Sequence, residues 1–109
     1  MPNPYSERMN EPMPNALLSI QIIPKTPNGE DVIPYVDRAI EVIQASGVKY
    51  QVNPLETTME GDLDELLAIV KKMNEAVIEF GSPGIISQIK ISYNPKGVSM
   101  DKLIEKYRP

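Results

Sequence analysis

Apolar and polar residues alternate along residues 16–23, which predicts a β-strand. Leu18, Ile20 and Ile22 fall on one face of an extended chain, and the other face mixes polar with apolar side chains. A strand of this kind suits a sheet that helices cover on one side. Pro24 ends the run, because proline cannot supply an N–H group to a sheet.

Residues 31–46 repeat apolar residues at the helical spacing i, i+3, i+4 and i+7, which predicts an amphipathic helix. Its apolar stripe consists of Val36, Ala39, Ile40 and Ile43. Asp31 is placed to cap the start, and Pro34 in the first turn sacrifices no needed N–H group. Gly47 is expected to end the helix.

Residues 61–80 predict a second, longer helix, which Gly81 and Pro83 would end. Its apolar face consists of Leu63, Leu66, Leu67, Val70, Met73, Val77 and Phe80. Asp62 and Glu65 have the spacing of a capping box, in which two side chains satisfy free N–H groups at the helix start.

Three further strands and a short helix complete the prediction. Residues 48–53 and 55–60 read as short strands, forming either a hairpin or one bent strand around Pro54. Residues 85–93 alternate as the last strand, and residues 100–106 follow as a helix. Residues 1–15 contain four prolines and predict a flexible tail, so residues 16–109 are expected to form a single domain.

This order predicts an α+β fold with a ferredoxin-like βαββαβ antiparallel sheet, two helices on one face and a short C-terminal helix. The opposite, open face would then carry mainly polar residues: Ser19, Gln21, Gln51, Asn53, Glu56, Thr58, Glu60, Gln88 and Lys90. Leu17, Ile23 and Ile86 lie among them. Either water covers this face, or a second copy of the chain does. The isolated apolar residues and the exposed strand edges favour a homo-oligomer, a dimer or a tetramer.

Composition narrows the possible chemistry. The 109 residues include no Cys and no His, which excludes disulfides, thiolate catalysis and Cys-based zinc sites and removes the usual general base. The net charge of −4 comes without a basic stripe, so nucleic acid is not an expected partner. No apolar run is long enough to span a membrane, and a cytoplasmic location is expected. No metal or cofactor motif is present.

The segment from Pro54 to Gly61 is unusually polar for a strand inside a small fold. Hydroxyls and carboxylates that become buried there need partners. Neighbouring strands or a second subunit could supply them. Alternatively, the segment holds a polar ligand, with Glu60 accepting two hydrogen bonds from an aminopyrimidine.

At this segment the sequence resembles the thiamine-binding protein family. The family pattern Pro-x-x-Thr-x-x-Glu-Gly stands here as Pro54, Thr57, Glu60 and Gly61. Residues 19–24, 46–50 and 89–91 also match the family, so the resemblance extends from about residue 16 to residue 93. It implies a ferredoxin-like fold, a homo-oligomer and non-catalytic binding of thiamine or its hydroxymethylpyrimidine part.

The resemblance assigns Thr57 and Glu60 to the ligand, and Ser87 stands where the family often has Thr. The chain departs from the family at Gly84, where Arg is common, and at residues 92–94, where a charged stretch is common. The candidate ligand-binding residues are Ser19, Gln21, Asn53, Thr57, Thr58, Glu60 and Ser87. Strand alternation places Thr57 and Ser87 on the helix side of the sheet, but Thr58 and Glu60 on the open side.

Two other functions compete with ligand storage or transport. The same strand order occurs in amino-acid-sensing regulatory modules, which bind their ligand at a subunit interface. A small dimeric α+β-barrel enzyme is the third alternative. Without His, its base would have to be Glu56, Glu60 or Tyr50.

Overall fold

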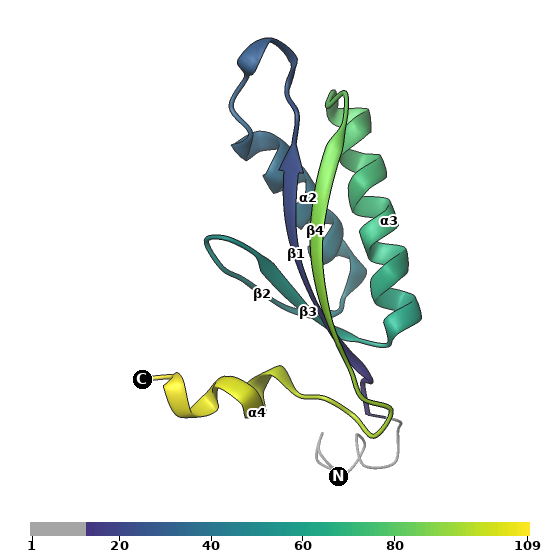
Figure 1. The fold of residues 1–109 in the computed structure, drawn as a ribbon, viewed down its shortest axis with the longest axis vertical. Helices are drawn as coiled ribbons and strands as arrows, with labels where there is room; N and C mark the ends of the chain where they lie inside the picture. The colour runs from purple at the N-terminus through teal and green to yellow at the C-terminus, as the bar shows by residue number, and fades with distance from the viewer. Residues whose placement is uncertain (1–12) are drawn as a thin grey trace.

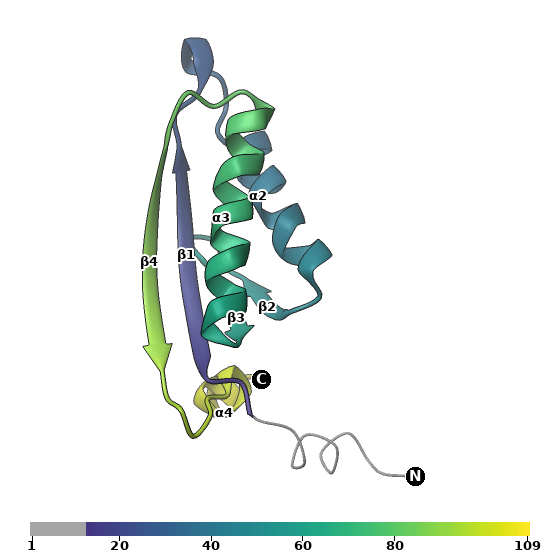
Figure 2. The same ribbon diagram turned by 90° about the vertical axis from the view of Figure 1, so that its right-hand side faces the viewer.

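The computed structural model describes residues 13–109, and these form one antiparallel sheet with strand order β2-β3-β1-β4. Helices α2 and α3 cover one face of that sheet (Figures 1 and 2). This confirms the predicted ferredoxin-like α+β fold. The elements are β1 (Ala16–Pro24), α2 (Ile33–Ser46), β2 (Lys49–Val52), β3 (Thr57–Gly61), α3 (Leu63–Phe80), β4 (Ile85–Tyr93) and α4 (Met100–Ile104).

Strand β1 is central and has the predicted alternation. Leu18, Ile20 and Ile22 are buried beneath the helices, whereas Ser19 and Gln21 on the opposite face are partly exposed. On one side β1 pairs along its whole length with β4, and on the other its residues 16–20 pair with β3. The alternation therefore sets which face of the sheet the helices cover.

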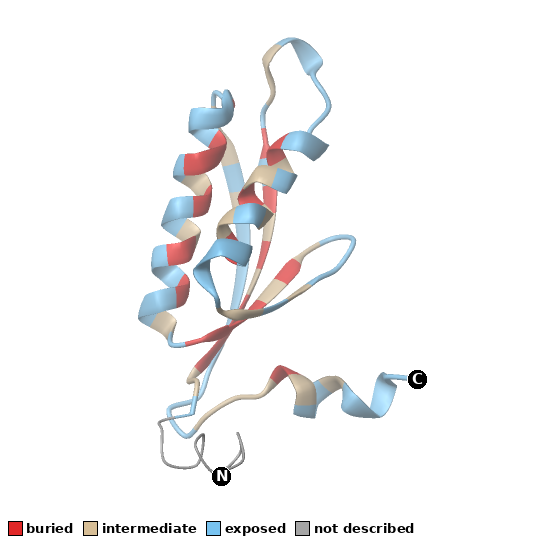
Figure 3. Cartoon of the chain, turned by 180° about the vertical axis from the view of Figure 1, so that it is seen from behind, coloured by how far each residue is buried: buried red, intermediate tan, exposed pale blue. Residues whose placement is uncertain are grey.

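Side chains from both layers form one core between the helices and the sheet. In Figure 3 the buried residues, coloured red, recur along the sheet strands and along both long helices. The largest fully buried side chains are Leu18, Ile43, Met59, Leu66, Met73 and Val77. The apolar faces of β1 and α2 therefore pack against the buried face of α3, as the hydrophobic pattern predicted.

The segment around Pro54 is a hairpin, which settles the choice between a hairpin and a bent strand. Both strands are shorter than predicted, because residues 53–56 form the turn. The Asn53 N–H donates to the Glu56 carbonyl at 3.0 Å. Proline has no N–H for a ladder and restricts the residue before it, so the chain turns here instead of pairing.

Helix α2 begins two residues later than predicted. Val32 occupies the cap position, and the Asp31 carboxylate accepts a hydrogen bond from the Ile33 N–H at 3.0 Å. The helix ends as predicted at Gly47, whose φ of 80° lies in the left-handed region that favours glycine.

Helix α3 differs from the prediction at its start and on one side. Gly61 belongs to β3, and the Asp62 side chain makes no capping bond. Instead, the Leu63 N–H donates to the Asn15 side chain at 2.9 Å. Leu67 was predicted to be buried but is exposed, whereas Ile69 is buried. Packing against α2 sets the rotation of α3 about its axis, so that Ile69 faces the core. The spacing of apolar residues along the helix does not determine this rotation.

Residues 13–15, at the end of the predicted tail, are held by the fold. The Asn15 carbonyl accepts from the Asn94 N–H at 2.8 Å, and the Pro14 carbonyl accepts from the Val98 N–H at 2.9 Å. Residues 1–12 of that predicted tail lie outside the described residues.

Helix α4 is joined to the β2–β3 hairpin by a few contacts from Glu60 and Lys49. The Met100 side chain is buried, and the Met100 N–H donates to the Glu60 carboxylate at 2.7 Å. Asp101 forms ion pairs with Lys49 and with Arg108. These two cations lower the pKa of the Asp101 carboxyl, Lys49 being the larger cause. Polar contacts therefore hold much of this helix to the sheet.

Two Leu→Ala variants test where the core lies. Leu18 is fully buried and Leu103 on α4 is 61% exposed. Because Leu18→Ala leaves a cavity, it should lower the free energy of unfolding by about 2–5 kcal/mol. Leu103→Ala should change it by about 0.5 kcal/mol or less. Chemical denaturation measures both values, and equal losses would contradict this assignment of the core.

Candidate ligand-binding site

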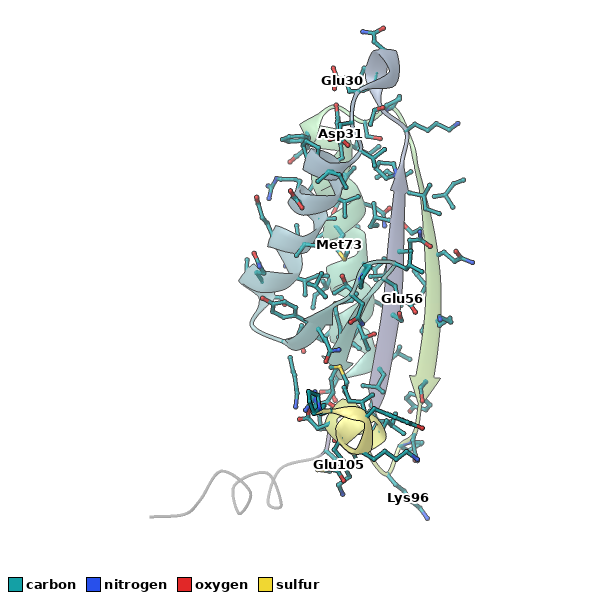
Figure 4. The ribbon with its side chains drawn as sticks, turned by 90° about the vertical axis from the view of Figure 1, so that its left-hand side faces the viewer. Glu30, Asp31, Glu56, Met73, Lys96 and Glu105 are labelled. Carbon is teal, nitrogen blue, oxygen red and sulfur yellow. The ribbon has the colours of Figure 1, made fainter. Side chains whose placement is uncertain are left out.

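A cavity of about 220 Å³ lies where β1, the turn of the β2–β3 hairpin and the start of α2 meet. Figure 4 shows Met73 between the helices and the sheet, and Glu56 beside β1. The residues that line the cavity are Ile20, Gln21, Ile22, Val32, Ile33, Val36, Ala39, Ile40, Asn53, Pro54, Leu55, Glu56, Thr57 and Met73. Its walls are thus mainly apolar, and its polar groups come from β1 and the hairpin.

The cavity lies at an open stretch of the β1 edge. Pairing with β3 stops at Ile20 and Thr57, whereas β1 continues to Pro24. Along an antiparallel strand, alternate residues direct both their N–H and their C=O toward the same neighbour. Beyond Ile20, where β3 has ended, such groups of β1 are available to a ligand.

Thr57 and Thr58 point to opposite faces of the sheet, as predicted. Thr57 is buried opposite Ile20 and lines the cavity from the helix side. Thr58 lies opposite Ser19 and Gln51 on the open face. Of the two hydroxyls, that of Thr57 is the one placed beside the apolar walls of the cavity, where it can donate and accept hydrogen bonds.

Glu56 holds the hairpin turn against the sheet. Its carboxylate accepts from the Ser19 hydroxyl at 2.5 Å and pairs with the Lys90 amine at 3.1 Å. Its pKa lies below the ordinary value, chiefly because of the Ser19 hydroxyl and then because of Lys90. A carboxylate with a lowered pKa is a weaker general base. Glu56, offered above as a possible base, therefore has the contacts of an anchor for the turn.

Glu60 lies apart from this cavity. Its buried carboxylate holds the Met100 N–H, and it lines a separate cleft of about 350 Å³ beside α4. Lys49, Gly47 and Ser99 are among the other residues that line that cleft. Negative charge beside the first N–H group of a helix is favourable, which gives Glu60 a structural role at the start of α4.

Ser87 is also separate from the cavity. Its hydroxyl donates to the Asn74 side chain at 2.8 Å and so joins β4 to α3. The structure therefore divides the predicted residues into four locations. Gln21, Asn53 and Thr57 line the cavity, and Ser19 and Thr58 lie on the open face, whereas Glu60 and Ser87 each stand elsewhere.

The apolar wall of the cavity was not predicted from sequence. Val32 and Ile33 were assigned only to the start of a helix, and Leu55 to a strand. All three side chains are exposed around the cavity, Leu55 by 76%. The only indication in the sequence was that these apolar residues stand next to a turn and next to a helix start. The sequence did not show that the two segments lie together in the fold and line one cavity.

Residues 13–109 contain neither a metal-ligand cluster nor a membrane-spanning helix. No group of three carboxylates or other ligand side chains is close enough there to hold a metal ion. No helix of that range has the length and apolar character needed to cross a bilayer.

Comparison with known proteins gives consistent matches over nearly the whole described chain. The model of the family described as thiamine-binding protein matches residues 18–108. A UPF0045 protein of Clostridium perfringens is 47% identical over 91 residues, covering 84% of this chain and 95% of that protein. The UPF0045 protein YqgV of Bacillus subtilis is 32% identical over 80 residues, covering 70% of this chain and 77% of that protein.

Solved structures agree with these sequence matches. A domain of unknown function from Bacillus cereus superposes with a TM-score of 0.82 at 43% identity, covering 87% of this chain and 91% of that one. A candidate thiamine biosynthesis/salvage protein from Thermotoga maritima gives a TM-score of 0.79 at 33% identity, covering 87% of this chain and 100% of that one.

The anchoring role of Glu56 predicts a pH dependence of stability. Its folded-state pKa is below the ordinary value of 4.5, so ionised Glu56 stabilises the fold fully above that value. This contribution is lost as the pH falls through the lower, folded-state pKa. The melting temperature of wild type should therefore be higher than that of Glu56→Gln at neutral pH. The difference between the two melting temperatures should shrink in acid. In a Ser19→Ala background the difference should be smaller throughout. A difference that stays constant with pH would contradict the anchor.

Proposed function

The chain belongs to the thiamine-binding protein family, and from this premise we propose that it binds thiamine or its hydroxymethylpyrimidine part without transforming it. The observation that carries the proposal is the cavity beside the open stretch of β1. It combines the motif residue Thr57 with apolar walls and unpaired strand groups. Small-molecule sites have this composition, with mostly apolar walls and a few placed polar groups.

The size of the cavity favours the pyrimidine part of the ligand. Its volume of about 220 Å³ is below the range of about 300–1,000 Å³ usual for drug-sized ligands. A single substituted ring fits that space, and the rest of thiamine would extend past Leu55 and Ile33 at the exposed rim.

An aminopyrimidine presents a donor, its exocyclic amine, next to an acceptor, its ring nitrogen. One residue of β1 beyond Ile20 presents the complementary pair, because its C=O and N–H point to the same side. Extended peptides use the same kind of main-chain recognition when they add to a strand edge. In our proposal the Thr57 hydroxyl and the Asn53 side chain complete the polar contacts.

Glu60 has a different role in this proposal from the one that the family resemblance implied. Its carboxylate is already hydrogen-bonded to the Met100 N–H. We therefore propose that it supports α4 and does not contact the ligand in the cavity. The proposed function is binding and not catalysis, in line with the lowered pKa of Glu56, the one cavity carboxylate among the bases considered above.

Titration calorimetry tests the proposal directly. Thiamine and hydroxymethylpyrimidine should both bind saturably, and the thiazole part alone should bind far more weakly. Thiamine should be recovered unchanged after long incubation. Saturable binding of an amino acid, with no heat from either pyrimidine, would overturn the proposal in favour of an amino-acid-sensing module.

Two Thr→Val variants locate the site. Thr57→Val removes a hydroxyl from the cavity, whereas Thr58→Val removes the neighbouring hydroxyl from the open face. Losing one hydrogen bond of about 1.4 kcal/mol weakens binding about tenfold. We expect that loss of affinity for Thr57→Val and nearly unchanged affinity for Thr58→Val. The reverse order would place the ligand on the open face.

A further inference from the structure

The ligand cavity contains no side chain that could balance a negative charge. Of the residues that line it, Glu56 alone is charged, and its carboxylate bonds to Ser19 and Lys90 on the open face of the sheet. The remaining polar side chains at the walls, such as those of Thr57 and Asn53, are neutral. A phosphate ester carries a charge of about −1.5 to −2 at pH 7, and its oxygens bind most strongly to charged donors. The walls of this cavity offer none.

The start of α2 lies at the cavity, and a helix start is a common place for an anion to bind. Here its N–H groups are already used. The Ile33 N–H donates to the Asp31 carboxylate at 3.0 Å, and Pro34 has no N–H. The N–H groups of the next two residues both donate to the Val32 carbonyl, each at 3.0 Å. A carboxylate of the chain itself therefore occupies the position that an anionic ligand would take.

Two carboxylates stand next to each other at this helix start. Figure 4 shows Glu30 and Asp31 where the loop after β1 leads into α2. The Tyr35 hydroxyl donates to the Glu30 carboxylate at 2.7 Å and so fixes its position. We call Glu30 and Asp31 the acidic rim. A ligand that extends from the cavity past Ile33 and Leu55 leaves it beside the acidic rim, because Asp31 holds the Ile33 N–H.

The basic side chains of the fold are placed elsewhere. In residues 13–109 no Lys or Arg lines the cavity, and no ion pair includes the acidic rim. Lys25, the basic residue nearest to Asp31 in the sequence, lies against Gly84 at the start of β4. Arg38, the next nearest, pairs with Glu41 at 3.2 Å and lines a separate groove between α2 and α3. The acidic rim therefore keeps its negative charge.

We propose that the cavity selects the unphosphorylated form of its ligand, binding the free alcohol as a neutral molecule or a cation and rejecting its phosphate esters. This inference rests on the proposed function, because it concerns the same cavity. Thiamine has a permanent positive charge on its thiazolium ring, and its hydroxyl group is at the end remote from the pyrimidine. With the pyrimidine in the cavity, the cation would lie near the acidic rim and be attracted to it. A phosphate on the hydroxyl would be repelled by the same two carboxylates.

This selectivity places the protein before a phosphoryl-transfer reaction. In that class of reaction the hydroxyl oxygen of the alcohol loses its proton and bonds to a phosphoryl group that a nucleoside triphosphate supplies. The protein would hold the alcohol that such a reaction consumes and would not retain the ester that it produces.

Calorimetry with a series of ligands of different charge tests the selectivity. Hydroxymethylpyrimidine is neutral, thiamine is a cation, and thiamine monophosphate carries a net negative charge. At low salt the monophosphate should bind at least tenfold more weakly than thiamine, and added salt should reduce this ratio because it screens exposed charges. If thiamine binds and the monophosphate binds equally well or better, this inference fails and the proposed function stands. If neither pyrimidine compound nor the ester binds, the proposed function fails and this inference with it.

An Asp31→Asn variant tests whether the acidic rim causes the selectivity. Asparagine can still accept from the Ile33 N–H, so the helix start should be preserved. Removing one exposed charge should weaken thiamine binding by about two- to fivefold and strengthen monophosphate binding by a similar factor. The affinity for the neutral hydroxymethylpyrimidine should stay the same. The control Asp64→Asn removes the same charge from the first turn of α3, at the opposite end of β1, and should change none of the three affinities.

A Glu30→Gln variant repeats the test if Asp31→Asn does not fold, because Gln can still accept from the Tyr35 hydroxyl. It should shift the two charged ligands in the same opposite directions. Circular dichroism checks that each variant is folded. A ratio of thiamine to monophosphate affinity that matches wild type in the folded variants would overturn the role of the acidic rim.

Discussion

Strand β1 pairs with partners of different length on its two sides, and this difference organises the molecule. On one side β4 pairs with all nine residues from Ala16 to Pro24, whereas on the other β3 pairs with Ala16–Ile20. Pro54 makes the hairpin turn before β3 can extend further. Beyond Ile20 the strand is therefore left open beneath the start of α2, and the candidate ligand cavity lies there.

Strand β1 separates the ligand cavity from the far edge of the sheet. The cavity lies on the hairpin side of β1, between the sheet and α2, whereas the edge strand β4 lies on the other side. Glu56 spans the two regions, since it belongs to the hairpin turn but bonds to Ser19 of β1 and to Lys90 of β4.

The sequence predicted the features that follow from periodicity. The alternation of Leu18, Ile20 and Ile22 identified the buried face of β1, and the opposite directions of Thr57 and Thr58 followed from the same rule. Sequence could not predict the rotation of α3, which exposes Leu67 and buries Ile69. That choice depends on how α3 packs against α2 and the sheet, not on spacing within the helix.

Glu60 shows the limit of motif reasoning. The family pattern groups it with Thr57, three residues away, but in a strand these two residues point to opposite faces. In the folded chain the Glu60 carboxylate accepts a hydrogen bond from the Met100 N–H at the start of α4. Predicting this required knowing where the last ten residues lie, and no local pattern in Glu60's own segment contains that information.

The account is tested most directly by mapping the amide signals of ¹⁵N-labelled protein during titration with hydroxymethylpyrimidine. If the ligand occupies the open stretch of β1, the largest shifts should fall on Gln21, Ile22, Asn53 and Thr57. Shifts confined to Lys49, Glu60 and Ser99, around the cleft beside α4, would contradict it.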